Sequence, residues 1–421
     1  MLDLTQSTSA DRALGHHAME RLAELDAFTD EPGMLTRLYL SPAHRRAVDC
    51  LLGWWRALGI EAKLDAAGNV IARYEGETPG APALIIGSHI DTVRNAGRYD
   101  GNLGVVAALT AVEQLARRGE RLPFAIEVVA FGDEEGVRFP TTLSGSRALA
   151  GTFNPATLDE RDRDGVSRRD ALTAFGCDPD GIGAVARKRD QVLGFLEVHI
   201  EQGPVLESEG LPVGIVTAIN GATRLAVQMR GTAGHAGTVP MGLRHDALTC
   251  AATAIVAIEE LARSQPGLVA TVGRIEARPG AVNVIPGEAL FTVDIRSSDD
   301  AQRTRAVAEI GARLGALAQA RAIALEITTT HEAAACACHP DIVSQIEAAV
   351  ARQGLRPLRL ASGAGHDTMA VAALCPVGML FVRCDGGISH NPAERITVED
   401  ADAAVRVLLD AIRRFRPVPG R

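Results

Sequence analysis

The 421-residue sequence lacks any apolar run of the ~18 residues needed to cross a membrane. It has no basic stripe, and its formal net charge of −9 argues against a surface that binds nucleic acid. It has no internal repeat and no low-complexity segment. The first residues, with Asp3, Asp11 and Arg12, lack the apolar core of a signal peptide. We therefore expect a cytoplasmic protein with no membrane or nucleic-acid partner.

Cysteine is also scarce. Seven cysteines, an odd number, are scattered along the chain, which indicates free thiols in a reducing compartment. Cys336 and Cys338 lie near His331 and His339 in a spacing that resembles a metal site. The short Cys-Ala-Cys spacing has no second matched pair, so we do not expect a structural zinc there, and a role for these two cysteines stays open.

The apolar residues that are present, 47% of the chain, are enough for two domains. Four short apolar runs flanked by glycine or proline predict buried parallel strands at residues 83–87, 124–131, 195–198 and 377–382. Residues 103–117, closed by Gly119, predict a crossover helix between the first two strands. Strand, helix and strand form a βαβ unit, so the loops after both strands should meet at one sheet edge.

Five potential metal ligands stand in or near the loops that follow these strands: His89, Asp100, Glu135, His199 and His390. Three imidazoles and two carboxylates without a nearby thiolate are typical of a hydrolytic zinc or manganese site. Taken alone, a histidine in an apolar strand is more often a core residue, and Asp133 before Glu134 is interpreted as a surface or capping carboxylate. The joint occurrence in this order predicts a two-metal hydrolase.

The pattern changes after Gly214. Residues 224–230 alternate like a half-exposed strand, and they are followed by a helical, two strand-like, a helical and a strand-like segment: 246–263, 269–275, 289–296, 301–320 and 324–328. The order β-α-β-β-α-β is that of the split ferredoxin-like motif. The sequence thus predicts a second domain inserted into the first.

Six motifs carry a resemblance to a known family: Gly-Ser-His-Ile-Asp at 87–91, Asp-Gly-Asn-Leu-Gly at 100–104, Glu-Glu-Gly-Val-Arg-Phe at 134–139, His-Ile-Glu-Gln-Gly-Pro at 199–204, Gly-His-Ala-Gly-Thr-Val-Pro-Met at 234–241 and Ser-His-Asn-Pro at 389–392. From about Leu35 to the C-terminal helix, the chain resembles the hydantoinase/carbamoylase branch of the di-zinc aminoacylase and carboxypeptidase superfamily. This branch includes allantoate amidohydrolase, N-carbamoyl-L-amino-acid hydrolase and β-ureidopropionase. The segment at 199–204 is the most specific, because peptidase relatives usually carry a carboxylate at that metal position.

The resemblance implies an α/β fold. A catalytic domain with a phosphorylase/hydrolase-like mixed sheet would comprise residues 1–215 and 331–421, interrupted by a ferredoxin-like α+β lid and dimerisation domain at 216–330. It also implies a homodimer that binds two divalent ions per subunit, Zn²⁺ or Mn²⁺, with Co²⁺ or Ni²⁺ as alternatives. Asp100 would bridge the ions, His89 and His199 completing one set of ligands, Glu135 and His390 the other.

The family also implies roles around the ligands. Asp91 would accept the second ring N–H of His89, and Glu134 would act as the general base. His235 would donate a hydrogen bond to the developing oxyanion, reaching across the dimer interface.

The remaining substrate residues are assigned by position and by resemblance. Asn283 and Arg296 would grip the substrate carboxylate, whereas a strand-end Arg296 taken alone would be a surface cation. Gln202 would face the ureido or amide end of the substrate, and a glycine-rich loop would offer backbone contacts from Gly363, with His366 near the site.

We therefore expect an amidohydrolase that cleaves a non-peptide C–N bond in a small carboxylate-bearing carbamoyl or amidine compound. An N-carbamoyl-L-amino acid and allantoate are both possible substrates. Thr223, where allantoate-specific relatives tend to have Arg or Gln, weakens the case for allantoate unless Arg224 substitutes. The alternatives are a dipeptidase or aminoacylase-like deacylase, against which His199 argues, and a non-catalytic binding protein, against which the intact ligand set argues.

Overall fold

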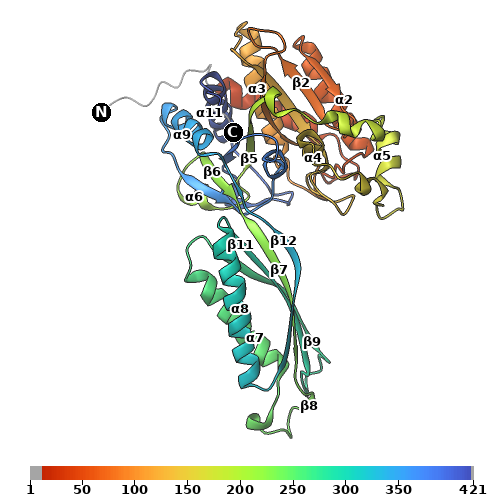
Figure 1. Cartoon of the computed structure of the whole chain (residues 1–421), viewed down its shortest axis with the longest axis vertical. Helices are drawn as coiled ribbons and strands as arrows, with labels where there is room; N and C mark the ends of the chain where they lie inside the picture. The colour runs from red at the N-terminus through yellow and green to blue at the C-terminus, as the bar shows by residue number, and fades with distance from the viewer. Residues whose placement is uncertain (1–11, 419–421) are drawn as a thin grey trace. The chain divides into compact units, whose positions relative to one another are not determined.

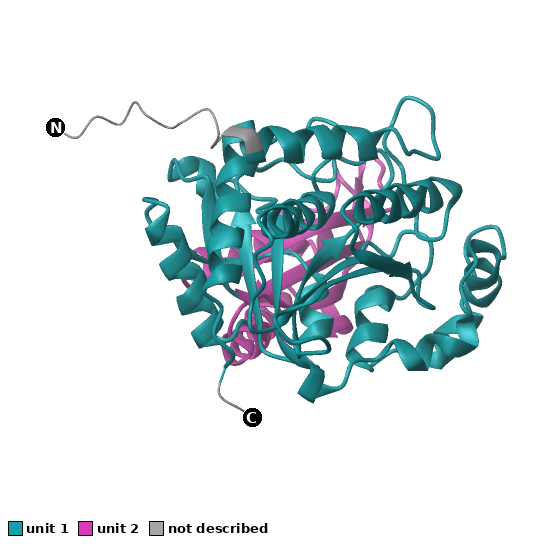
Figure 2. Cartoon of the chain, turned by 90° about the horizontal axis from the view of Figure 1, so that it is seen from above, with its two compact units in different colours: residues 1–217, 338–421 teal, residues 218–337 magenta. Residues whose placement is uncertain are grey.

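The computed structural model describes residues 12–418, so the residues behind the signal-peptide expectation, 1–11, lie outside the described part (Figure 1). The chain divides into two compact units (Figure 2): unit 1 is residues 1–217 and 338–421, and unit 2 is residues 218–337. The predicted end of the second domain, residue 330, falls inside β12 (Ala324–Ala333), which pairs with its neighbour as far as Ala333.

Unit 1 is built on a mixed sheet with the strand order β1-β2-β4-β3-β5-β15-β6, and β14 pairs with β6; β13, the last two residues before the chain re-enters unit 1, adds to the β6 edge. The four predicted buried strands form its parallel centre: β3 (Ala83–His89), β4 (Ala125–Phe131), β5 (Val192–Ile200) and β15 (Val377–Val382). Their nearly continuous apolar sequence follows from helices on both faces, which leave almost no side chain in contact with water.

The sequence did not predict the strands that flank this parallel centre: β1 (Glu61–Leu64), β2 (Val70–Tyr74), β6 (Val213–Ile219), β13 (Cys336–Ala337) and β14 (Arg359–Ser362). β1 and β2 form an antiparallel hairpin against β4, and β6 runs antiparallel to β15. They make the sheet mixed rather than parallel.

The predicted crossover helix is α3 (Asn102–Arg117), which is buried along most of its length. A Cβ atom at Gly104 would lie 2.1 Å from the carbonyl oxygen of Val198, so glycine permits the helix to pack directly on β5. The other helices of unit 1 are α1 (Arg12–Asp26), α2 (Pro42–Ala57), α4 (Ser144–Ala150), α5 (Arg168–Phe175), α6 (Val205–Ser208), α9 (Pro340–Arg352), α10 (Asp367–Val371) and α11 (Val398–Arg413). Short 3-10 turns occur at Pro155–Asp159, Pro179–Val185, Arg189–Gln191 and Asp385–Gly387.

Unit 2 is a four-stranded antiparallel sheet with the order β12-β7-β11-β9, in which β7 is Gly221–Arg230, β9 is Val269–Arg278 and β11 is Glu288–Ser297. Helices α7 (Ala247–Arg263) and α8 (Asp300–Ala320) lie on one face (Figure 1). Alternate residues of β7 and β11, such as Leu225 and Phe291, form the core with these helices. A small ladder of β8 (Gly234–His235) and β10 (Val284–Ile285), with a 3-10 turn at Met241–Leu243, lies at one end of the sheet.

Within residues 12–418, no helix combines the length and apolar character that a membrane span requires.

Candidate metal centre

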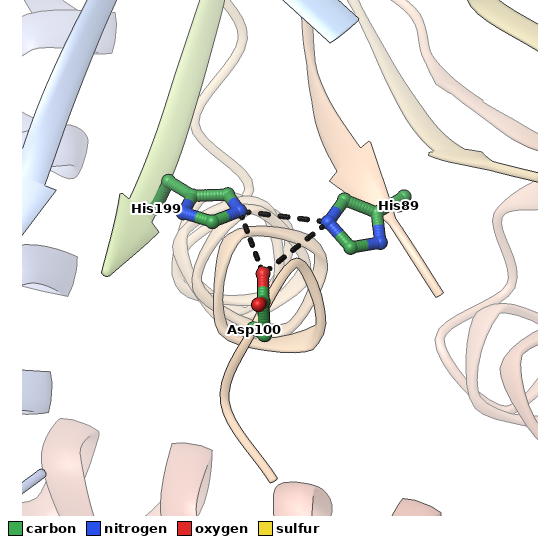
Figure 3. Close-up of side chains that lie close together, drawn as sticks. All are labelled: His89, Asp100 and His199. Atoms are coloured by element: carbon green, nitrogen blue, oxygen red, sulfur yellow. Dashed lines mark hydrogen bonds and ion pairs between the residues drawn. The ribbon is translucent and has the colours of Figure 1, made fainter. Parts of the chain in front are cut away.

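Two histidines and an aspartate meet at the carboxyl edge of the parallel strands. His89 ends β3, and His199 is the second-last residue of the neighbouring β5. Asp100 Oδ1 lies 3.0 Å from His199 Nε2 and 3.5 Å from His89 Nε2, and the three side chains point toward one another (Figure 3). Gly101 has φ +65°, and a Cβ there would lie 2.5 Å from the His89 ring, so glycine permits this close approach.

The second oxygen of Asp100 faces a different set of side chains. His390 Nε2 lies 3.0 Å from Asp100 Oδ2 and 3.5 Å from Glu135 Oε2. His390 is about half exposed, whereas Asp100 and Glu135 are nearly buried. The structure therefore brings all five predicted ligands together, with Asp100 between a His89–His199 group and a Glu135–His390 group.

The donor set fits divalent cations. Glu134 Oε2 lies 3.9 Å from His89 Nε2, so Glu134 and Glu135 add two carboxylates to the same small volume. Burial and the charge of Asp100 raise the pKa of Glu135 to about 7, against the opposing effect of His89. Buried carboxylates that repel one another beside imidazole nitrogens form a set that a bound cation would stabilise.

The backbone orients both buried imidazoles. His89 Nδ1 lies 2.9 Å from the carbonyl oxygen of Asp91, and His199 Nδ1 lies 2.9 Å from that of Ile200, so each ring presents Nε2 to Asp100. The predicted partner of His89 was instead the Asp91 carboxylate, which lies 3.8 Å away. That carboxylate accepts the backbone N–H groups of Glu134 and Glu135, each at 3.2 Å, because the loops after β3 and β4 are neighbours.

Gln202 contacts the ligands themselves. Its Nε2 donates to Asp100 Oδ2 at 2.9 Å and to Ser389 Oγ at 3.1 Å, whereas the sequence predicted that Gln202 faces the substrate. Glu394, which the sequence did not single out, accepts the backbone N–H groups of Tyr99 and Asp100 and lies 2.9 Å from Ser389 Oγ. Its place four residues after His390 is the signal that could have identified it. Glu394 thus joins the Asp100 loop to the His390 loop.

His366 is a buried residue that packs against one of the candidate ligands, His199. It is 1% exposed, and its ring packs edge-on against His199 with the centroids 4.4 Å apart. Its Nε2 lies 2.8 Å from Ser362 Oγ. Gly363 is in the loop between β14 and α10 that carries this histidine. His366, which the sequence places near the site, thus contacts the ring of a candidate ligand in this structure.

Asp133 does not have its predicted exposed position. Its side chain is 0% exposed and forms an ion pair with Arg168, which is equally buried. The interpretation of Asp133 as a surface or capping carboxylate was wrong.

The sequence matches the peptidase family M20/M25/M40 over residues 85–414, which includes every ligand described above. The chain belongs to this family.

Within the M20/M25/M40 family, the chain is 41% identical to allantoate deiminase 1 of Glycine max over 93% of this chain and 87% of that protein. It is also 41% identical to an N-carbamoyl-L-amino acid amidohydrolase of Geobacillus stearothermophilus, over 94% of this chain and 98% of that protein. Among solved structures, a hydantoinase/carbamoylase family amidase from Burkholderia multivorans superposes with a TM-score of 0.90 at 32% identity, covering 96% and 98% of the two chains. The predicted resemblance to the hydantoinase/carbamoylase branch is confirmed.

In this M20/M25/M40 protein, the candidate substrate residues of unit 2 lie at opposite ends of its sheet. His235 pairs with Val284, and the carbonyl oxygen of Asn283 accepts the N–H of Ala236, so His235 and Asn283 are neighbours. Arg296 is near the far end of β11, eight residues beyond Glu288, or roughly 25 Å along an extended strand. The structure therefore does not place Asn283 and Arg296 as a pair on one carboxylate within one chain.

Arg296 already has a carboxylate partner within unit 2. Its Nε and one terminal nitrogen donate to Asp294 at 2.7 and 3.0 Å, and Arg224 Nε donates to the same carboxylate at 3.0 Å. Thr223 points to the opposite, covered face, where its Oγ1 accepts a hydrogen bond from Arg303 at 3.0 Å. Of the two residues considered for a role in substrate choice, Arg224 is the exposed one.

Proposed function

We propose that this protein is a two-metal amidohydrolase. The ligands would be those predicted from the sequence, with Asp100 bridging, and the ions Zn²⁺ or Mn²⁺, with Co²⁺ or Ni²⁺ as alternatives. The observation that carries the proposal is that the two oxygens of Asp100 face two separate ligand groups. Divalent ions held by these residues would polarise a carbonyl and lower the pKa of water.

Glu134 is the proposed general base. Its side chain is 12% exposed and reaches the ligand cluster beside His89. Burial raises the pKa of Glu134 well above its ordinary value, against the charge of His89, and Glu135 raises it further. A carboxylate made more basic in this way is suited to accept a proton from the attacking water and to deliver it to the leaving nitrogen.

The proposed substrate is a small carboxylate with a carbamoyl or amidine nitrogen, of which an N-carbamoyl-L-amino acid and allantoate are the two examples. The names of the relatives support both. A histidine at position 199, rather than a carboxylate, supports hydrolysis of a non-peptide C–N bond over a dipeptidase or deacylase activity. Arg296, with its planar fork, is the proposed partner of the substrate carboxylate.

We also propose a homodimer formed through unit 2, with that unit acting as a lid and His235 serving the partner's site. The separation of Asn283 from Arg296 supports this arrangement, because a second copy can supply one of the two. Large apolar side chains near His235 and Asn283 are exposed: Met241 at 78%, Leu243 at 70% and Val282 at 106%. An apolar group of this kind is typical of a protein interface.

The seven cysteines are free thiols, which supports the proposed cytoplasmic location. The proposed partners are a small-molecule substrate and a second copy of the chain.

A substrate panel tests the activity. The protein, stripped by a chelator, is reconstituted separately with Zn²⁺, Mn²⁺, Co²⁺ or Ni²⁺ and incubated with N-carbamoyl-L-amino acids, their D-enantiomers, allantoate, N-acetyl amino acids and dipeptides. We expect ammonia from a carbamoyl compound or from allantoate. Release of free amino acid from the acetyl compounds or dipeptides without ammonia from the others would favour the deacylase or dipeptidase alternative. Turnover equal to that of the stripped protein with every metal would contradict a metal-dependent hydrolase.

A further inference from the structure

A buried ion pair lies directly next to the proposed general base in the sequence. Asp133 precedes Glu134 and Glu135, and its carboxylate is paired with Arg168, the first residue of α5. Both side chains are 0% exposed. A charged pair removed from water in this way costs desolvation free energy and is weak support for stability on its own. Its value therefore lies in the other groups that it holds in place.

The backbone around Glu134 has a conformation that needs support. Asp133 has φ +69° and Gly136 has φ +61°, so two left-handed residues bracket Glu134 and Glu135. A non-glycine side chain is sterically strained in this region, so Asp133 needs contacts that hold it there. The turn lies in the segment 132–145, whose ends are joined by backbone hydrogen bonds from Leu143 to Asp133 and from Gly145 to Gly132.

The Arg168 side chain contacts several residues of this segment at once. One terminal nitrogen of its guanidinium contacts Asp133 and Ser144, and the other donates to the carbonyl oxygen of Thr141 at 3.1 Å and to Glu160 at 2.9 Å. The guanidinium also stacks on Phe139, 4.6 Å from the ring centroid. Four residues of the segment, Asp133, Phe139, Thr141 and Ser144, therefore converge on one arginine.

Asp91, in the loop after β3, accepts the backbone N–H groups of Glu134 and Glu135. The backbone of these two glutamates is thus held at two points. The Asp91 carboxylate orients their N–H groups, and the ion pair with Arg168 fixes Asp133, the residue before them. We propose that the Arg168–Asp133 pair is a positioning device that sets the direction of the Glu134 and Glu135 side chains toward the His89–Asp100 cluster. This inference rests on the proposed function of Glu134.

The test separates positioning from stability. In Asp133→Asn and Arg168→Met, we expect kcat to fall about 100-fold with little change in KM, the size of effect that a misplacement of about 1 Å produces. Arg168→Lys should recover part of the loss, because an ammonium cannot reach all four partners of the planar fork. In the double variant Asp133→Asn/Arg168→Met, neither member of the fully buried pair is left with an unpaired charge, and Glu160, with a 23% exposed side chain, still contacts water, so most of the lost melting temperature should recover while kcat stays low.

Glu113→Gln is the matched control. Glu113 is a carboxylate of unit 1 that is also almost fully buried, with a 1% exposed side chain, and it is paired with Arg21 and Arg117. It should lower the melting temperature and leave kcat unchanged. Hydrogen–deuterium exchange of the metal-stripped proteins gives a readout without turnover: the peptide covering residues 133–144 should exchange faster in Arg168→Met and not in Glu113→Gln.

Recovery of kcat together with the melting temperature in the double variant would overturn the inference, as would unchanged exchange in Arg168→Met. Glu134→Gln is measured in parallel. If Glu134→Gln loses turnover while Arg168→Met keeps it, the positioning role fails and the proposed function stands. If Glu134→Gln keeps turnover, the proposed base is wrong.

Discussion

Two aspartates, one in each unit, show how differently the same side chain is used. Asp100 in unit 1 has a 4% exposed side chain and is surrounded by three imidazole rings. Asp294 in unit 2 has a 28% exposed side chain and lies between Arg224 and Arg296. Asp100 gathers imidazole nitrogens that fit a metal cation, and Asp294 neutralises two guanidinium groups that would otherwise be available to an anion. The candidate ligands of unit 1 thus contact one another within one chain. In unit 2 the side chains are partly exposed, so they can also contact a molecule that binds there.

The largest effect on activity should come from a substitution in the buried cluster of unit 1. Glu134→Gln removes the proposed proton acceptor and keeps the shape of the side chain, so kcat should fall about 10²- to 10⁴-fold. Metal content, measured by elemental analysis, should not change, because the five predicted ligands remain. Substantial turnover, or loss of metal together with activity, would show that Glu134 has a different role.

A substitution of His235 tests whether an exposed side chain of unit 2 acts in the transition state. His235→Ala should lower kcat about 10²- to 10³-fold with a smaller change in KM, because a donor to a developing oxyanion acts mainly in the transition state. His16→Ala, a change at another exposed histidine, should have no effect. The measurement is steady-state kinetics on the best substrate of the panel.

Subunit mixing decides whether His235 acts across an interface. Exchange of inactive His235→Ala and Glu134→Gln subunits should restore activity in one site of each heterodimer. Analytical ultracentrifugation of differently tagged subunits verifies the exchange. Absence of recovery after verified exchange would place His235 in the site of its own chain or outside any site.

Arg296 tests recognition of the substrate carboxylate. Arg296→Ala should remove about 2–5 kcal/mol of transition-state stabilisation, which lowers kcat/KM roughly 30- to several-thousand-fold. Arg296→Lys should recover part of this loss. Amide or ester analogues of the substrate should react poorly with the unaltered protein. Near-normal kcat/KM in Arg296→Ala with a large loss in Arg224→Ala would assign the carboxylate to Arg224 instead.

The two regions also differ in how well the sequence predicted them. The ligands of unit 1 were predictable because each lies at the end of a continuous apolar strand or in the segment after it, and parallel strands must end at one sheet edge. The antiparallel β1–β2 hairpin was not predicted, because its short polar-flanked segments lack that signal. Glu394 and Arg168 were missed because each acts through contacts that connect distant parts of the chain; only the place of Glu394, four residues after His390, is a local signal, and nothing in the local pattern marks Arg168.

Asp133 shows the limit of local pattern most clearly. A carboxylate followed by two glutamates has the composition of a solvated loop, and its burial depends on Arg168, which is 35 residues away along the chain. In unit 2, alternation predicted the strands well, but it could not reveal that Arg296 is paired with Asp294 or that Asn283 lies at the other end of the sheet.

The smallest expected effect concerns Asp294 itself. Its carboxylate holds the Arg296 fork that we propose for the substrate, so the two carboxylates compete for one guanidinium. Asp294→Asn removes the competing charge and keeps an oxygen that accepts a hydrogen bond. Because partly exposed ion pairs contribute about 0–1 kcal/mol, KM should fall by no more than about fivefold, with kcat unchanged. The effect should vanish in an Arg296→Ala background, where no fork remains to be freed. A higher KM in Asp294→Asn would mean that Asp294 aims the arginine at the substrate rather than competing with it.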